Sequence, residues 1–155
     1  MDVVVTVPKQ GWRDWLAEGH CAEEPCIYEE GEYHYFGWGE APTIVPGERV
    51  YIVAHGRVRG YAPLVRLARP AAREAGWWRG AHWALVRRGQ ARAVTIPDVV
   101  RGFRGWRYRW WDRGSEEAFR DWQTAGVPAS QHLHAAGDFW DQVAAKLYRR
   151  IEGSV

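Results

Sequence analysis

The segment from Arg101 to Arg113 has the residue types that hold nucleic acid, because it interleaves arginine with large aromatic side chains. Arginine grips phosphate through its planar guanidinium group, and aromatic rings stack on bases. On a β-strand, alternate residues point to opposite faces. One face would then carry Arg107, Arg109 and Trp111, and the other Trp106, Tyr108 and Trp110. We therefore predict nucleic-acid contacts from Arg104, Arg107, Arg109, Trp106 and Tyr108.

The same alternation has a structural explanation, in which the aromatic face belongs to the core and the arginines form a solvated outer face. A sixth candidate, Arg57, follows His55 and Gly56 at a predicted turn, from which its side chain could reach phosphate. A hairpin turn requires glycine there in any case.

Four further aromatic residues are candidates for a pocket that holds a single base, since such a pocket needs ring plates around it. They are Trp12, Trp15, Tyr35 and Trp38. Tryptophans at helical spacing, such as the first two, more often belong to a core. Trp38 lies between two glycines on a predicted loop, which favours a role in binding.

Known catalytic patterns are absent from the sequence: it has no phosphate loop, dinucleotide fingerprint, nucleophile elbow or zinc-protease motif. His20, Cys21, Cys26 and His34 depart from the ligand spacing of structural zinc sites. We predict no catalytic residue, no metal and no cofactor. A hydrolase built from Lys9, a tyrosine and a glutamate of the acidic loop is the alternative.

The elements that must position these residues can be read from the pattern of apolar residues. We expect strands at 2–7, 33–36, 49–53, 57–67, 81–88, 91–96 and 103–111. Helices are expected at 9–18, at 115–122 and over a final apolar stripe at 139–151, with a helical turn at 97–100. Pro63 should make its strand bulge or lie at an edge.

This order of elements favours an α+β fold: a small open β-barrel of mostly antiparallel strands flanked by helices. A chain of 155 residues has the size of one domain, so we predict a single domain over 1–155, with 114–152 as a helical extension packed on it. No stretch is apolar enough to span a membrane, and two cysteines fit a reducing compartment, so a cytoplasmic location is expected.

Charge is distributed unevenly along the chain. From Glu18 to Glu40 there are seven acidic residues and no lysine or arginine, whereas Arg87 to Arg113 contains eight arginines. Such asymmetry indicates either a site for a polyanion or complementarity between two faces of one fold. The 11 tryptophans exceed what a core of this size readily buries.

Four short segments carry a family resemblance. Val-Val-Val-Thr-Val-Pro at 3–8 with Trp-Arg-Asp-Trp-Leu at 12–16, then Pro-Gly-Glu-Arg-Val-Tyr-Ile-Val at 46–53 and Gly-Arg-Val-Arg-Gly-Tyr at 56–61, resemble the PUA-like superfamily of ASCH, EVE and YTH domains. The resemblance covers about the first 110 residues, chiefly as an order of elements. The Gly-x-Lys-x-x-Glu-x-Arg pattern usual in ASCH domains is not present.

The resemblance implies a pseudo-barrel with a pocket between sheet and helices that binds RNA or a modified base. We therefore expect a nucleic-acid-binding domain that recognises one base, modified or not, of RNA or of single-stranded or flipped DNA. The alternatives are an ASCH-like hydrolase of acylated nucleosides, which the missing pattern disfavours, and a protein-interaction module.

Overall fold

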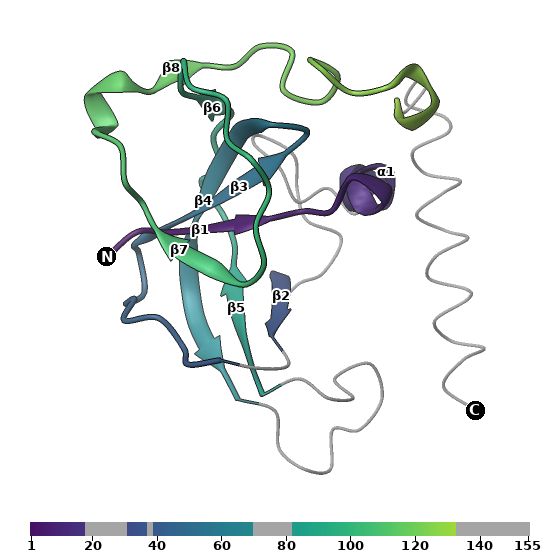
Figure 1. Cartoon of the computed structure of the whole chain (residues 1–155). Helices are drawn as coiled ribbons and strands as arrows, with labels where there is room; N and C mark the ends of the chain where they lie inside the picture. The colour runs from purple at the N-terminus through teal and green to yellow at the C-terminus, as the bar shows by residue number, and fades with distance from the viewer. Residues whose placement is uncertain (18–30, 37–38, 70–81, 133–155) are drawn as a thin grey trace, which may run out of the picture.

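The computed structural model describes residues 1–17, 31–36, 39–69 and 82–132, and for Tyr35 only the backbone. These residues form a mixed α+β structure dominated by strands (Figure 1). A six-stranded sheet has the order β2-β5-β4-β3-β1-β7, and a two-stranded ribbon joins β6 to β8. The strands are β1 (Val3–Thr6), β2 (Glu32–Phe36), β3 (Arg49–Ala54), β4 (Arg57–Ala68), β5 (Trp83–Arg87), β6 (Val94–Thr95), β7 (Trp106–Tyr108) and β8 (Glu117–Ala118).

Strand β1 lies inside the sheet, between β3 and β7. Its pairing with β3 is parallel and its pairing with β7 is antiparallel, while the other pairs of the sheet are antiparallel. Both faces of β1 are covered as well, because Val3 and Val5 pack in one core cluster and Val4 in another, and all three valines are buried. The predicted first strand is confirmed.

The long strand β4 joins the two halves of the sheet. Its first half pairs with β3 from Arg57 to Pro63, and its second half pairs with β5 from Leu64 to Ala68. The register with β5 shifts between Leu64 and Arg66, one residue after Pro63, so the bulge expected in this strand is present. The described strands form no closed barrel, because β2 and β7 remain the two edges of the sheet.

The hairpin between β3 and β4 turns at His55 and Gly56, as predicted. Both residues have positive φ angles, 47° and 74°, as a two-residue turn of the I′ type requires. Further along β4, Gly60 has a φ of 149°, and a Cβ there would lie 2.4 Å from the Arg92 carbonyl oxygen. Glycine at position 60 therefore allows the segment before β6 to approach β4.

Apolar residues pack on both faces of the sheet. One core cluster contains Val3, Val5, Val50 and Ile52, together with Trp12 from the N-terminal helix. The other cluster contains the residues of β1 and β3 that alternate with these, Val4, Tyr51 and Val53, together with Val58, Ile96, Val100 and Trp111. Each residue of β7 must therefore face one of two different packed layers.

The first predicted helix is present as a short 3₁₀ turn, η1 (Lys9–Gly11), followed by α1 (Trp12–Ala17). Figure 1 shows α1 continuing from β1 beyond the end of the sheet. Among the described residues, no helix has the length and apolar character needed to cross a membrane.

The helix predicted over 115–122 is wrong. Asp112, not Ser115, caps the local structure: its carboxylate accepts from the Gly114 N–H at 2.8 Å, and a 3₁₀ turn, η2 (Arg113–Ser115), follows. The chain then forms β8, which pairs with β6. This pairing satisfies backbone groups that a helix would have satisfied internally.

Other differences are smaller. The strand expected at 91–96 is reduced to β6, the one at 103–111 to β7, and 97–100 is a bend rather than a helical turn. A third 3₁₀ turn, η3 (Ala129–Gln131), ends the described part. The final helix predicted over 139–151 lies outside the described residues.

Candidate nucleic-acid interface

The arginine- and tryptophan-rich segment lies across one end of the sheet before it becomes the edge strand β7. The Val100 N–H donates to the Gly56 carbonyl at 2.9 Å, which places the segment against the turn between β3 and β4. The Phe103 N–H then donates to the Thr6 hydroxyl at 3.3 Å, at the end of β1. From Trp106 the chain runs back along β1 as β7 (Figure 1).

Trp106 and Tyr108 share one face of β7, as predicted, but their side chains are half-buried and pack against the first core cluster. Their rings contact each other at 4.8 Å. The Trp106 indole donates to the Glu40 carbonyl at 2.9 Å, and the Tyr108 hydroxyl accepts from the Thr43 N–H at 2.9 Å. These two residues hold the loop before β3 on the sheet. They therefore have the structural role that the sequence allowed as an alternative, in which the aromatic face belongs to the core, and we leave them out of the interface.

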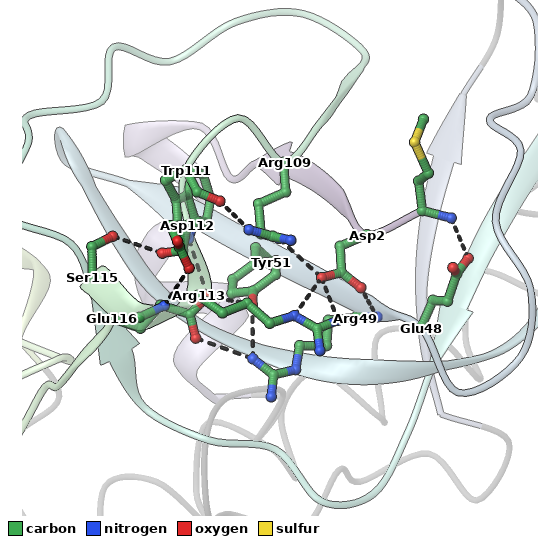
Figure 2. A network of polar contacts seen from close by, with 12 residues as sticks. Asp2, Glu48, Arg49, Tyr51, Arg109, Trp111, Asp112, Arg113, Ser115 and Glu116 are labelled. Atoms are coloured by element: carbon green, nitrogen blue, oxygen red, sulfur yellow. Dashed lines mark hydrogen bonds and ion pairs between the residues drawn. The ribbon is translucent and has the colours of Figure 1, made fainter.

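Arg109 also has a structural partner. Its Nε lies 3.0 Å from an oxygen of Asp2, and a second nitrogen donates to the Trp111 carbonyl. Asp2 is buried, with 3% of its side chain exposed, and accepts in addition from Arg113 at 2.7 Å and from the Arg49 backbone N–H at 3.0 Å. Figure 2 shows these donors gathered around one carboxylate.

The electrostatics of Asp2 follow from these contacts. Burial by itself would raise the pKa of the Asp2 carboxyl. The Arg49 N–H and the guanidinium groups of Arg113 and Arg109 outweigh burial and hold that pKa below its ordinary value. Asp2 is therefore ionised at neutral pH and binds β7 and the residues after it to β1.

Glu116 forms the second half of this network. It accepts from the Tyr51 hydroxyl at 2.5 Å, from the Trp111 indole at 3.1 Å and from Arg49 at 3.1 Å. Burial, followed by the Glu116 hydrogen bond, raises the pKa of Tyr51, so its hydroxyl stays protonated. Glu116 thus fixes the chain after β7 onto the second core cluster.

The charges in Figure 2 balance. The network contains four positive groups, the Met1 ammonium and the guanidinium groups of Arg49, Arg109 and Arg113. It also contains four carboxylates: those of Asp2, Glu48 and Glu116 are ion-paired, and that of Asp112 accepts from the Gly114 N–H. A balanced network attracts an external polyanion weakly, because its field falls off quickly with distance. We therefore assign this network to stability rather than to binding.

A different set of arginines at the same edge is exposed. Arg101, Arg104 and Arg107 are exposed, and Arg57 is partly exposed at the start of β4. Among the described residues, none of these four lies within 4.0 Å of a carboxylate oxygen. The Arg107 guanidinium instead lies over the Phe103 ring, 4.5 Å from its centroid. Charge that is not neutralised within the protein remains available to a ligand.

Trp110 lies beside these arginines, and 51% of it is exposed. Its ring contacts Phe103 at 6.3 Å and Trp111 at 5.0 Å, at interplanar angles of 69° and 86°. The alternation of strand residues had placed Trp110 with Trp106, but β7 ends at Tyr108 and Trp110 lies beyond the strand. The turn sequence Asp-Arg-Gly that follows at 112–114 is the signal that could have indicated this.

We define the β7 surface as Arg101, Phe103, Arg104, Arg107 and Trp110. Of the six residues predicted to contact nucleic acid, Arg104 and Arg107 belong to this surface. Arg57 pairs with Ala54 of the first core cluster, whereas Phe103 packs against the second, so Arg57 is left out. Arg101, Phe103 and Trp110 belong to the same surface but were not among the predicted contacts.

Of the four residues predicted to form a base pocket, the two with described side chains, Trp12 and Trp15, lie in the core. Trp12 and Trp15 are buried and stacked on each other, with ring centroids 5.1 Å apart. The Trp12 indole donates to the Gln123 carbonyl at 3.0 Å, and the Trp15 indole donates to Glu32. Tyr35 is on β2 with its side chain outside the description, and Trp38 lies outside the described residues.

Two further buried arginines, Arg59 and Arg87, are bonded inside the fold. Arg87 pairs with Glu32 at 2.5 Å and donates to the Val50 carbonyl at 2.8 Å. Arg59 donates to the carbonyls of Ala54, Trp122 and Ala125 at 2.9, 2.9 and 2.6 Å. Both are inaccessible to a ligand.

Lys9, proposed for the alternative hydrolase, is exposed in η1. Within the described ranges, no three histidine, cysteine, aspartate or glutamate side chains gather as metal ligands. His20, Cys21 and Cys26 lie outside those ranges.

Comparison of the chain with protein-family models, with curated proteins and with solved structures found no match.

Proposed function

We propose that this protein is a PUA-like nucleic-acid-binding domain of the cytoplasm and that it binds through the β7 surface. The observation that supports the proposal is the contrast between two sets of arginines at one edge of the sheet. Arg109 and Arg113 are paired with a buried carboxylate, whereas Arg101, Arg104 and Arg107 are exposed with no carboxylate among their described neighbours.

This contrast bears on function because exposed like charges repel one another in the free protein. Phosphates of a nucleic acid relieve that repulsion and accept hydrogen bonds from the guanidinium groups. Binding releases counterions from the nucleic acid, so affinity falls as salt rises. For three neutralised phosphates of a single strand, the slope of log K against log salt is roughly −2, at about 0.7 per phosphate.

The order of elements along the first 110 residues supports the same proposal, since it resembles domains that bind RNA or modified bases. The resemblance does not identify the contact residues. The proposed contacts are therefore taken from exposure and pairing in this chain: Arg101, Arg104 and Arg107.

The test is fluorescence anisotropy of a labelled single-stranded oligonucleotide at two salt concentrations. We expect binding that weakens with salt. The double variant Arg104→Glu/Arg107→Glu should bind about 30-fold more weakly, at roughly 1 kcal/mol for each of the two exposed charge contacts. Its salt slope should be smaller in magnitude by roughly 1 to 2.

The matched control is Arg69→Glu/Arg88→Glu, which changes the net charge equally. Both control residues are exposed, and Arg88 directly follows β5, which β4, β3 and β1 separate from β7 in the strand order. The control should bind nearly as the parent does. Salt-insensitive binding, or equal losses in the two double variants, would contradict the proposal.

A further inference from the structure

We infer that the β7 surface takes an unpaired base, stacked on Trp110, so that its ligand is single-stranded rather than duplex nucleic acid. The inference rests on the proposed function and adds to it the residue that reads the base. It replaces Trp12, Trp15, Trp106 and Tyr108 in that role, because these are buried or half-buried with their polar groups bonded inside the fold.

The first step is that Trp110 is both exposed and held. Its neighbour Trp111 is buried, donates to Glu116 and meets Tyr51 at 5.1 Å and 80°. On its other side, Phe103 is fixed to β1 through its backbone N–H. A ring supported by ordered neighbours loses little conformational freedom on binding, which favours stacking.

The second step is that the Trp110 ring is not covered face to face. Both of its aromatic contacts are steeply inclined, at 69° and 86°, and within the described part of the chain no ring stacks parallel to it. Stacking on a base requires a free ring face. In a duplex each base already stacks on its neighbours, so only an unpaired base can stack on the Trp110 ring.

The third step is the charge around the plate. Phe103 lies between Trp110 and the Arg107 guanidinium, and Arg104 is exposed next to it in sequence. An aromatic plate beside cations matches a nucleotide, in which a base is joined to phosphates. An uncharged apolar partner would leave these arginines without counter-charge, which makes a single strand the better occupant.

The experiment compares three oligonucleotides of equal length: a single strand, the same strand in a duplex, and a strand with abasic positions that keeps the phosphates. They are titrated against the parent protein, Trp110→Leu and Trp110→Phe. For Trp110→Leu we expect about 5- to 150-fold weaker binding to the single strand, the range for one lost stack. Its binding to the abasic strand should be unchanged, and Trp110→Phe should retain most of the affinity.

The readouts separate the two proposals. If binding depends on salt but Trp110→Leu binds the single strand as the parent does, the stacking inference fails and the proposed function stands. If no oligonucleotide binds, both fail. Equal parent affinity for single strand and duplex also overturns the inference. The inference is also overturned if the free protein self-associates in sedimentation velocity and Trp110→Leu abolishes that self-association. Trp110 would then lie in an interface between two copies of the chain.

Discussion

Asp2→Asn tests whether the Figure 2 network holds the edge of the sheet together. The substitution keeps the size of the side chain and removes its charge. Breaking a buried ion pair from one side costs about 3–5 kcal/mol, because the other charge is left without a partner. Here Arg109 and Arg113 keep 23% and 50% of their side-chain surface and can regain water, so we expect a smaller loss of about 2–3 kcal/mol.

The assay is urea and thermal unfolding followed by circular dichroism. For a chain of this size each kcal/mol lowers Tm by about 2–4 °C, so the variant should melt roughly 4–12 °C below the parent. Asp98→Asn is the control, since Asp98 is exposed and forms no ion pair among the described residues. A loss below about 0.5 kcal/mol would refute the assignment of this network to stability.

The difference in stability between the parent protein and Asp2→Asn should depend on pH. The pKa of Asp2 is lower in the folded protein than in the unfolded chain, so the unfolded chain binds the proton more readily. The stabilisation from Asp2 is therefore complete above its ordinary pKa of 3.8 and disappears as the pH falls through the folded value. The difference between parent and Asp2→Asn should shrink over that range and stay constant between pH 5 and 7.

Two further substitutions test the packing around this edge. Gly60→Ala should destabilise the fold by about 2–4 kcal/mol in urea unfolding, because the new Cβ meets the Arg92 carbonyl and the backbone φ is unfavourable. Glu116→Gln should cost about 1–3 kcal/mol, since Tyr51 loses a charged acceptor, and should alter the near-ultraviolet dichroism. Glu117→Gln, at the exposed neighbouring position, should do neither; equal effects would show that the contacts of Glu116 contribute little.

The strands of the sheet were largely predictable because their side-chain patterns are strong. The valine run of β1 and the β3–β4 hairpin with its His55-Gly56 turn follow from β-branched residues and turn chemistry. The parallel pairing of β1 with β3 was not predictable. A pattern of burial records that a strand is covered on both faces but not which strand lies beside it or in which direction.

The error at 115–122 has a tertiary cause. Ser115, Glu116 and Glu117 match a helix start, yet the Glu116 carboxylate is bonded to Tyr51 and Trp111 on another element. Those contacts and the pairing of β8 with β6 outweigh a local preference worth about 1 kcal/mol.

The β7 surface was predictable in composition but not in detail. Eight arginines from 87 to 113 indicated where positive charge concentrates, and Arg104 and Arg107 are indeed exposed. The position of Asp2 in the fold decides which arginines are neutralised. Asp2 is more than 100 positions away from Arg109 in the sequence, so the pattern of the segment does not reveal this pairing. Trp110 was assigned to the wrong face because the strand was expected to continue beyond Tyr108.

The place of β1 between β3 and β7 also has a consequence for synthesis of the chain. The register pairs Val4 with Tyr51 and with Arg107, so the second partner is made about 100 residues after β1. At roughly 5–20 residues per second, the ribosome needs about 5–20 s to supply it. During that time one edge of an apolar strand has no partner, and an unpaired edge is a template for aggregation. A chain interrupted before residue 106 would lack the cover for this edge and also Arg107 and Trp110 of the surface proposed to bind nucleic acid.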